Sequence, residues 1–325
     1  MQTIQSFAGQ VIENLEKVIV GKRDAIELIV IGLLCQGHVL IEDVPGVGKT
    51  MLARSLARSL ACTFNRIQFT PDMLPSDVTG TSIYNQQKSK FEFRPGPIIG
   101  QIILADEINR ATPKTQAALL EAMEEHQVTV DGDTHILPQP FMVLATQNPI
   151  EYEGTFPLPE AQLDRFLLRV RLGYPDFMDE VKILDEQRLS HPIESLKAVV
   201  KTREVLEAAR AVRTIFLSIP VKRYITDLTR RTRQSGDIYL GASPRGTLAL
   251  ARSSQARAAL NGRDHVLPDD VKDMAVPVLG HRIIVSPAAR LRELSADRIV
   301  QEIVHNTPAP GGDYHTPPLE KKKGK

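Results

Sequence analysis

The stretch VLIEDVPGVGKT, residues 39–50, decides how this chain is expected to fold. A short apolar run passes into a loop with two glycines, and a helical pattern follows from near Met51. A loop between a strand and a helix points successive backbone N–H groups at a phosphate, and the helix N-terminus adds partial positive charge. Lys49 would then reach the β- and γ-phosphates of a nucleotide, and the Thr50 hydroxyl would bind Mg²⁺.

One position of this loop departs from the common pattern. The pattern G-x-x-x-x-G-K-[ST] has glycine where this chain has Asp43. The alternative interpretation is a chance glycine turn ahead of a helix, but the apolar run before the loop and the helix after it favour phosphate binding. The candidate nucleotide-binding residues of the loop are Asp43, Pro45, Gly46, Val47, Gly48, Lys49, Thr50 and Met51.

A second motif, residues 102–107, is an apolar run that ends in two adjacent carboxylates. Side chains alternate along a strand, so Asp106 and Glu107 would face different directions. Asp106 can then hold the Mg²⁺ shell while Glu107 polarises an attacking water. Such a pair also occurs at an ordinary solvated strand end. Together with a phosphate-binding loop upstream, it favours ATP hydrolysis over binding alone.

A third apolar run, 141–145, leads to Asn148, whose amide could orient the water or sense the γ-phosphate; the alternative is an Asn-Pro turn. Charge neutralisation beyond Mg²⁺ usually comes from arginine. Arg165, after the helical pattern 159–163, and Arg245, in the first turn of a later helix, are two candidates. Either could instead be a surface arginine in a salt bridge. The candidate catalytic residues are therefore Lys49, Glu107, Asn148, Arg165 and Arg245, and the candidate metal ligands are Thr50 and Asp106.

The sequence divides into two parts and a tail. Residues 1–185 alternate short apolar runs with helical patterns, which predicts an α/β domain with a parallel sheet. The expected strands are 38–41, 66–69, 102–105, 141–145 and 167–171, and two hairpins are expected at about 80–95 and about 127–137. Residues 186–306 have helical patterns, including one over 202–218. The end, 307–325, is rich in Pro, Gly and Lys and is expected to be disordered.

The amino-acid composition argues against nucleic-acid binding and against membrane association. Forty Lys plus Arg against 39 Asp plus Glu give no global field that would attract nucleic acid or an anionic membrane. Trp is absent and aromatic residues are only 5%, which argues against base-stacking platforms. The two cysteines are expected to be free thiols in a reducing compartment. The start lacks an apolar secretory segment and the most apolar run is too short to span a bilayer, so we expect a cytoplasmic protein without membrane insertion.

Taken together, these motifs resemble the MoxR family of AAA+ ATPases over about residues 10–300. The segments that carry the resemblance are 43–50, 93–97, 105–111, 145–149, 158–166 and 243–245, of which 93–97 and 158–166 are the most specific. The family's own version of the loop tolerates Asp43. The resemblance implies an AAA+ P-loop NTPase core with a parallel sheet and flanking helices, followed by a small all-α lid domain at 186–306.

The resemblance also implies roles for single residues. Asn148 matches sensor 1, Arg165 matches the finger that reaches the neighbouring subunit's site, and Arg245 matches sensor 2. Val20 and Gly21 match the contact on the adenine side of the nucleotide. The first hairpin matches the helix-2 insert of this clade and the second its pre-sensor-1 hairpin.

At the level of the whole protein, the resemblance implies ATP/ADP and Mg²⁺ as cofactors and a homo-oligomer, a hexameric ring. It implies a chaperone-like ATPase that remodels, activates or matures client proteins that depend on metals or cofactors. Members of the family commonly act with a partner that carries a von Willebrand A domain. The identity of the client is not implied.

Two alternatives from other classes remain. The first is a nucleic-acid motor or loader, because relatives of this architecture handle DNA; the near-zero net charge argues against it. The second is a slow nucleotide switch, a binding module whose ATP state recruits partners without forceful remodelling. Asp106 and Glu107 favour turnover over a pure switch, but they do not set its rate.

Overall fold

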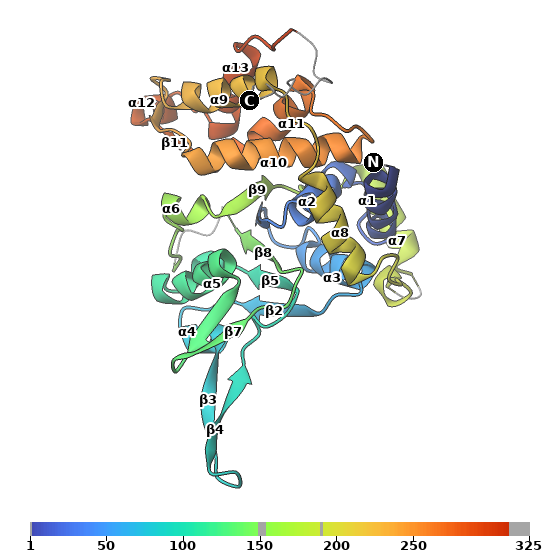
Figure 1. Cartoon of the computed structure of the whole chain (residues 1–325), viewed down its shortest axis with the longest axis vertical. Coiled ribbons are helices and arrows are strands. Elements are labelled where there is room, and N and C mark those ends of the chain that lie inside the picture. Colours follow the sequence, from blue (N-terminus) through green and yellow to red (C-terminus); the bar gives the residue numbers. More distant parts are fainter. Residues whose placement is uncertain (1, 149–153, 189–190, 312–325) are drawn as a thin grey trace, which may run out of the picture. The chain divides into compact units, whose positions relative to one another are not determined.

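A computed structural model describes residues 2–148, 154–188 and 191–311, and residues 6–209 form one compact unit built on a parallel sheet (Figure 1). The strands are β1 His38–Glu42, β2 Phe64–Gln68, β5 Ile102–Asp106, β8 Met142–Gln147 and β9 Phe166–Val170. Their order is β2-β5-β8-β1-β9, so β1 lies between β8 and β9. The predicted α/β fold is confirmed, and the five expected strands are present with their ends shifted by one or two residues.

The helices up to residue 212 follow one another between and around the strands in sequence. They are α1 Gln2–Glu16, α2 Arg23–Leu34, α3 Lys49–Ser59, α4 Pro75–Thr79, α5 Pro113–Glu125, α6 Glu160–Leu163, α7 Phe177–Glu186 and α8 Thr202–Val212, with 3₁₀ turns η1 Ile108–Arg110 and η2 Pro192–Glu194. On one face, α2 packs so tightly that a Cβ at Gly32 would lie 2.7 Å from the Val39 side chain. Strands covered on both faces need apolar residues throughout, which explains the unbroken apolar runs in the sequence.

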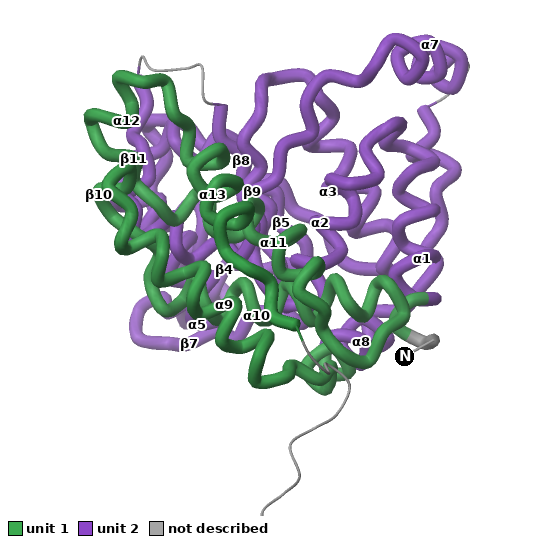
Figure 2. Tube along the Cα trace, turned by 90° about the horizontal axis from the view of Figure 1, so that it is seen from above, with its two compact units in different colours: residues 1–5, 210–325 green, residues 6–209 purple. Residues whose placement is uncertain are grey.

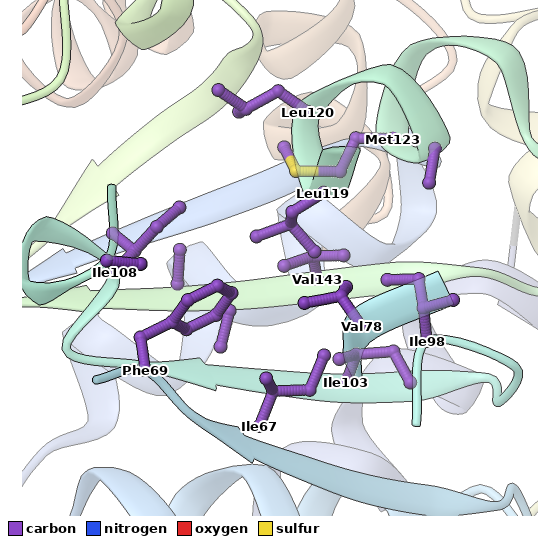
Figure 3. Packing of buried hydrophobic residues seen from close by; sticks show 14 of the residues in the cluster. Ile67, Phe69, Val78, Ile98, Ile103, Ile108, Leu119, Leu120, Met123 and Val143 are labelled. Carbon is purple, nitrogen blue, oxygen red and sulfur yellow. The ribbon is translucent and has the colours of Figure 1, made fainter. Parts of the chain in front are cut away.

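The opposite face of the sheet carries the hydrophobic core shown in Figure 3. Leu119, Leu120 and Met123 of α5 belong to the same buried cluster as Ile103 of β5 and Val143 of β8 (Figure 3). These side chains are at most 2% exposed. The apolar face of α5 thus fixes the helix on the strands whose ends carry the polar motifs.

Two hairpins extend from this unit at the expected places. They are β3 Gly80–Asn85 with β4 Lys90–Pro95, and β6 Gln127–Val130 with β7 Asp133–Ile136. The first projects away from the sheet (Figure 1) and exposes apolar side chains, Phe91 being 71% exposed. The rings of Phe93 and His135 stack with centroids 3.7 Å apart, so the two hairpins are in direct contact.

The second compact unit comprises residues 1–5 and 210–325 (Figure 2), described as far as residue 311. Its helices are α9 Ile219–Thr232, α10 Pro244–Leu260, α11 Pro268–Leu279, α12 Pro287–Leu291 and α13 Ala296–His305. Serine hydroxyls accept a hydrogen bond from a first-turn N–H at the start of α9, α10, α12 and α13, which explains where these helices begin. This helical region also contains a short antiparallel pair, β10 Ile238–Leu240 with β11 Ile284–Val285, which an all-α expectation does not include.

The division between the compact units falls later than the boundary expected near residue 185. The backbone N–H groups of Val199 and Val200 donate to the Ser59 carbonyl at the end of α3, at 3.0 and 3.3 Å. The Thr202 hydroxyl donates to the carbonyl of Leu60 at 3.5 Å. These contacts join the chain up to Ala209 to the sheet-containing unit, although its composition already resembles that of the helical part. The predicted tail is described only over 307–311.

The helix expected over 202–218 is shorter than predicted. Helix α8 ends at Val212, and Phe216 forms a β-bridge with His265 instead of a further helical turn. Ile215 is buried but not helical. Because it is apolar and falls at helical spacing, it made the helix look longer in the sequence than it is. None of the helices in the described part of the chain combines the length and the apolarity that crossing a bilayer needs.

His38, at the start of β1, is a buried imidazole that the sequence did not single out. Its Nδ1 accepts a hydrogen bond from the Val143 N–H at 3.0 Å, so its Nε2 carries the proton that faces the Met123 carbonyl at 3.0 Å. The neutral ring therefore joins β1, β8 and α5. Burial lowers the pKa of His38 from 6.5 to about 4.

We expect His38 to make the fold sensitive to acid. Between pH 6.5 and about 4, His38 is protonated in the unfolded chain and neutral in the folded chain. The free energy of unfolding therefore falls as the pH drops from 6.5 towards 4. The loss amounts to about 2 kcal/mol between pH 7.5 and pH 5. Urea unfolding at both pH values measures it, and His38→Gln should show a correspondingly smaller pH dependence. Equal pH dependence in the two proteins would contradict the assignment.

Candidate functional site

The predicted site residues meet at the carboxyl ends of three neighbouring strands. Because β5, β8 and β1 are adjacent and parallel, the segments that follow them lie at one edge of the sheet. They enclose a cavity of about 360 Å³. Its lining consists of Pro45, Gly46, Gly48, Lys49, Thr50, Met51, Arg66, Asp106, Glu107 and Asn148.

The loop after β1 has the backbone that a phosphate cradle needs. Gly46 and Gly48 have φ of +88° and +89°, a conformation that side-chain-bearing residues rarely adopt. Gly48 is the N-cap of α3, so the positive end of the helix dipole faces the cavity that the loop lines. The Lys49 ammonium also lies there and donates to the Asp43 carbonyl at 2.7 Å.

The Asp43 carboxylate binds backbone N–H groups of its own chain, whereas its place in the loop suggested a contact with phosphate. Its carboxylate accepts hydrogen bonds from the backbone N–H groups of Val44 at 2.8 Å and of Leu172 and Gly173 at 2.6 Å each. The residue is 8% exposed and is not part of the cavity lining. Asp43 therefore ties the base of the loop to the chain that leaves β9.

Asp106, at the end of β5, has both carboxylate oxygens engaged. Oδ1 accepts from the Thr146 hydroxyl at 2.6 Å, and Oδ2 accepts from Nε and Nη2 of Arg66 at 3.1 and 2.6 Å. The Thr146 hydroxyl in turn accepts from the Glu107 N–H at 2.8 Å. Thr146 is fully buried, so it fixes both carboxylate-bearing residues from β8.

Glu107 leaves the strand in a strained conformation. Its φ of 57° and ψ of 48° are left-handed, which a residue with a side chain adopts at a cost of about 1 kcal/mol. Its carboxylate Oε2 accepts from Gln68 Nε2 at 2.8 Å and from Arg110 Nη1 at 3.0 Å. Strand β5 ends at Asp106, so Glu107 lies directly after the strand, and both residues line one cavity.

Three residues at this site were missed in the sequence: Arg66, Gln68 and Thr146. Arg66 and Gln68 lie two residues apart on β2, an edge strand, and reach Asp106 at the end of the neighbouring β5 and Glu107 directly after it. The sequence held one usable signal, since Asn65, Arg66 and Gln68 make this strand more polar than the other strands of the sheet. No spacing rule connects Arg66 to Asp106, because the two residues are 40 positions apart.

Of the other predicted site residues, some line the cavity and some do not. Asn148 is 6% exposed and lines the cavity directly after β8. Val47 is absent from the lining, as are Val20 and Gly21. The segment before Val20 nevertheless lies near the loop, because a Cβ at Gly48 would be 4.0 Å from Ile19 Cδ1.

The two candidate arginines lie outside the cavity lining of their own chain. Arg165 directly precedes β9, which is parallel to β1, so it lies at the edge of the sheet opposite the cavity. Its Nε forms an ion pair with Glu124 on α5 at 3.0 Å. Arg245 belongs to the second compact unit, where its backbone N–H donates to the Ser243 hydroxyl at the start of α10.

The donor set fits Mg²⁺ bound together with a nucleotide. The Thr50 hydroxyl and the Asp106 carboxylate, both oxygen donors, line the same cavity. Among the described residues no group of three or more His, Cys, Asp or Glu side chains could hold a metal by itself. Mg²⁺ typically relies on one or two protein oxygens plus the phosphates of its nucleotide, and two such donors are what this cavity offers.

Comparison with known proteins agrees with this architecture. The family described as "ATPase family associated with various cellular activities (AAA)" matches residues 38–168, the region that contains the sheet except for the last two residues of β9. The AAA lid domain matches residues 230–303 in the helical unit. A crystal structure of a provisionally assigned ATPase from Cytophaga hutchinsonii superposes with a TM-score of 0.88 at 39% identity, covering 95% of this chain and 96% of that one.

Two relatives cover nearly the whole chain. The uncharacterised protein YeaC of Bacillus subtilis is 52% identical over 309 residues, 95% of this chain and 97% of its own length. Chaperone MoxR1 of Mycobacterium tuberculosis is 39% identical over 306 residues, 91% of this chain and 81% of its own length. The matches to the AAA family, to the AAA lid domain and to Chaperone MoxR1 show that the chain belongs to the MoxR family of AAA+ ATPases.

Proposed function

We propose that this protein hydrolyses ATP at a site completed by a second copy of the chain and uses the turnover to remodel partner proteins. One observation carries the catalytic part: a single cavity is lined by a glycine loop at a helix N-terminus, by Lys49, by the oxygen donors Thr50 and Asp106, and by Glu107 in its left-handed backbone conformation. Backbone N–H groups and Lys49 suit phosphates, and carboxylates suit Mg²⁺ and water. A site for phosphate binding alone would not need the strained Glu107.

Each residue has a defined part in this proposal. Lys49 and the loop N–H groups hold the β- and γ-phosphates, and Glu107 accepts hydrogen bonds from the attacking water. Asn148 orients that water or the γ-phosphate. When Mg²⁺ is bound by Thr50 and Asp106, it neutralises charge on the phosphates. The segment around Val20 and Gly21 would contact the adenine side, and Arg245 would report the nucleotide state to the lid.

The location of Arg165 supports assembly into a ring. A residue at the edge of the sheet opposite its own cavity cannot reach the phosphates bound there, but it can reach those of an adjacent copy. We propose a homo-oligomer, a hexamer by family resemblance, that works in the cytoplasm. One relative is called a chaperone, which supports remodelling of client proteins. From the family resemblance we also propose a partner with a von Willebrand A domain and clients that depend on metals or cofactors.

The hairpins are the segments we propose for contact with clients. Apolar side chains on β3–β4 are exposed: Ile83 by 46%, Tyr84 by 50% and Phe91 by 71%. The β6–β7 hairpin begins directly after α5 and also exposes Ile136, by 80%. Exposed apolar groups of this kind suit binding to unfolded or partly unfolded chains.

Lys49→Ala is the first test of the proposed site. We expect the affinity for fluorescent ADP to fall at least about 10-fold, because a charge-assisted contact to phosphate is removed. Fluorescence titration in the presence of MgCl₂ measures the dissociation constant. Lys182→Ala, on exposed α7, is the matched control and should bind like the unchanged protein. Unaltered ADP affinity in Lys49→Ala would place the nucleotide elsewhere.

A slow nucleotide switch is the second candidate, and one observation favours it. Oε2 of the Glu107 carboxylate accepts from Gln68 and Arg110 of its own chain, and these two donors compete with an incoming water for that oxygen. ATP turnover measured with and without a client-rich extract separates the two functions. A rate that stays below about one per hour at every protein concentration would favour the switch, given that enzymes typically turn over faster than about one per second.

A further inference from the structure

The residues that line the cavity include two cations, Lys49 and Arg66. The proposed reaction gives Lys49 a role but leaves Arg66 without one. Arg66 lies on edge strand β2, and its side chain is 46% exposed. Its guanidinium donates to Asp106 Oδ2 from two nitrogens and to the Gln68 side-chain oxygen from Nη2. Arg66 therefore pairs with the carboxylate that is expected to hold Mg²⁺.

This pairing leaves Asp106 little freedom toward a metal ion. Oδ1 already accepts the Thr146 hydroxyl, and Thr146 is fully buried and fixed by the Glu107 N–H. Oδ2 accepts from Nη2 and Nε of Arg66, at 2.6 and 3.1 Å. A divalent cation that binds Oδ2 would lie within a few ångströms of the guanidinium, where two positive charges repel.

We propose that Arg66 competes with Mg²⁺ for Asp106. Because of this competition, the affinity of the protein for nucleotide depends less on Mg²⁺ than it would without Arg66. This inference rests on the proposed nucleotide site. Without Mg²⁺, Arg66 neutralises Asp106, and the phosphates of the nucleotide do not face a bare carboxylate. With Mg²⁺, the guanidinium must leave Oδ2, and breaking its two charge-assisted hydrogen bonds opposes metal binding.

The proposal predicts the sign of a measurable coupling. We define the Mg²⁺ coupling as the dissociation constant of ADP without Mg²⁺ divided by that with Mg²⁺. Removing Arg66 exposes the Asp106 charge, which weakens ADP binding without Mg²⁺. It also removes the competitor, which favours Mg²⁺. Both changes raise the coupling.

The experiment uses N-methylanthraniloyl-ADP as the fluorescent probe, titrated in MgCl₂ or in EDTA. Arg66→Met keeps the apolar stem of the side chain and removes its charge. We expect the coupling to rise about 10-fold, the value of one or two charge-assisted hydrogen bonds at a half-exposed site. Arg54→Met, an exposed arginine on α3 outside the cavity lining, is the matched control and should leave the coupling unchanged.

A double-variant cycle tests whether the effect passes through Asp106. In an Asp106→Asn background the carboxylate is gone, so adding Arg66→Met should change the coupling less than twofold. Because this readout is an affinity for ADP, it does not depend on hydrolysis. Arg66→Gln serves the same purpose if Arg66→Met does not melt cooperatively, since it keeps a polar contact to Gln68.

The outcomes separate this inference from the proposed function. An unchanged or reduced coupling in Arg66→Met, or an equal rise in the Asp106→Asn background, would overturn the role given to Arg66 while leaving the nucleotide site intact. Failure of the unchanged protein to bind the probe would overturn the nucleotide site itself, and this inference with it. A rise that requires Asp106 supports the competition.

Discussion

Arg165→Ala is expected to lower ATP turnover about 10³-fold or more while leaving the affinity for ADP within about twofold. Arg165 directly precedes β9, at the edge of the sheet opposite the cavity of its own chain, so its removal leaves every lining residue in place. A finger arginine supplied by a neighbour stabilises charge on the transferring phosphoryl group and contributes to the transition state rather than to binding. Steady-state hydrolysis and fluorescent ADP titration measure the two quantities.

The matched control for this prediction is Glu124→Ala. Arg165 pairs with Glu124 at 3.0 Å, so both variants break the same ion pair and only one removes the guanidinium. If Glu124→Ala loses as much activity as Arg165→Ala, the arginine acts by holding α5 and not on a phosphate. In the unchanged protein, specific activity should also rise with protein concentration as copies assemble. A rate independent of concentration, from a monomer, would remove Arg165 from the reaction.

Glu107→Gln is expected to bind ATP normally and to hydrolyse it at least about 100-fold more slowly. The amide keeps an oxygen that can accept the hydrogen bonds from Gln68 and Arg110, so the local geometry is preserved. It cannot take up a proton, which removes the base that activates water. Single-turnover hydrolysis and size-exclusion chromatography with ATP measure rate and assembly together. Glu121→Gln, exposed on α5, is the control for loss of one negative charge.

Mixing the two variants tests action between copies. Glu107→Gln has an intact finger and Arg165→Ala has an intact cavity, so a mixed ring contains some interfaces with both groups present. For equal mixing this is about a quarter of the interfaces, so activity should recover to about that fraction of the unchanged protein. No recovery, with mixed rings shown to form, would mean that both residues act within one chain.

The fold was largely predictable because its strands are short apolar runs bounded by polar residues. Strands β1, β5 and β8 are covered on both faces, so Val39 and Leu40 both had to be apolar, and the run itself revealed the strand. The end of α8 was not predictable in the same way. Ile215 and Phe216 continue an apolar pattern, but a β-bridge from Phe216 to His265, far along the chain, decides their conformation.

The site was predictable where one short motif carries the chemistry and unpredictable where contacts between strands do. Lys49, Thr50 and Asp106 follow from local spacing. Thr146 and Arg66 each contact Asp106 across about forty positions of sequence, a separation that no local pattern encodes. The left-handed backbone of Glu107 was equally hidden, because position 107 is not a glycine and the Thr146 hydroxyl accepts a hydrogen bond from its N–H across the sheet.

The anchoring of Asp43 has a consequence for how this sequence can vary. Position 43 is glycine in the common form of the loop, and here it is a carboxylate bound to the amides of Leu172 and Gly173. A return to glycine would leave those two N–H groups without their acceptor, and a proline at 172 or 173 would remove a donor and crowd the buried carboxylate. Every residue except proline can supply these two backbone donors, so the anchor constrains the residue type at position 43 more than at positions 172 and 173.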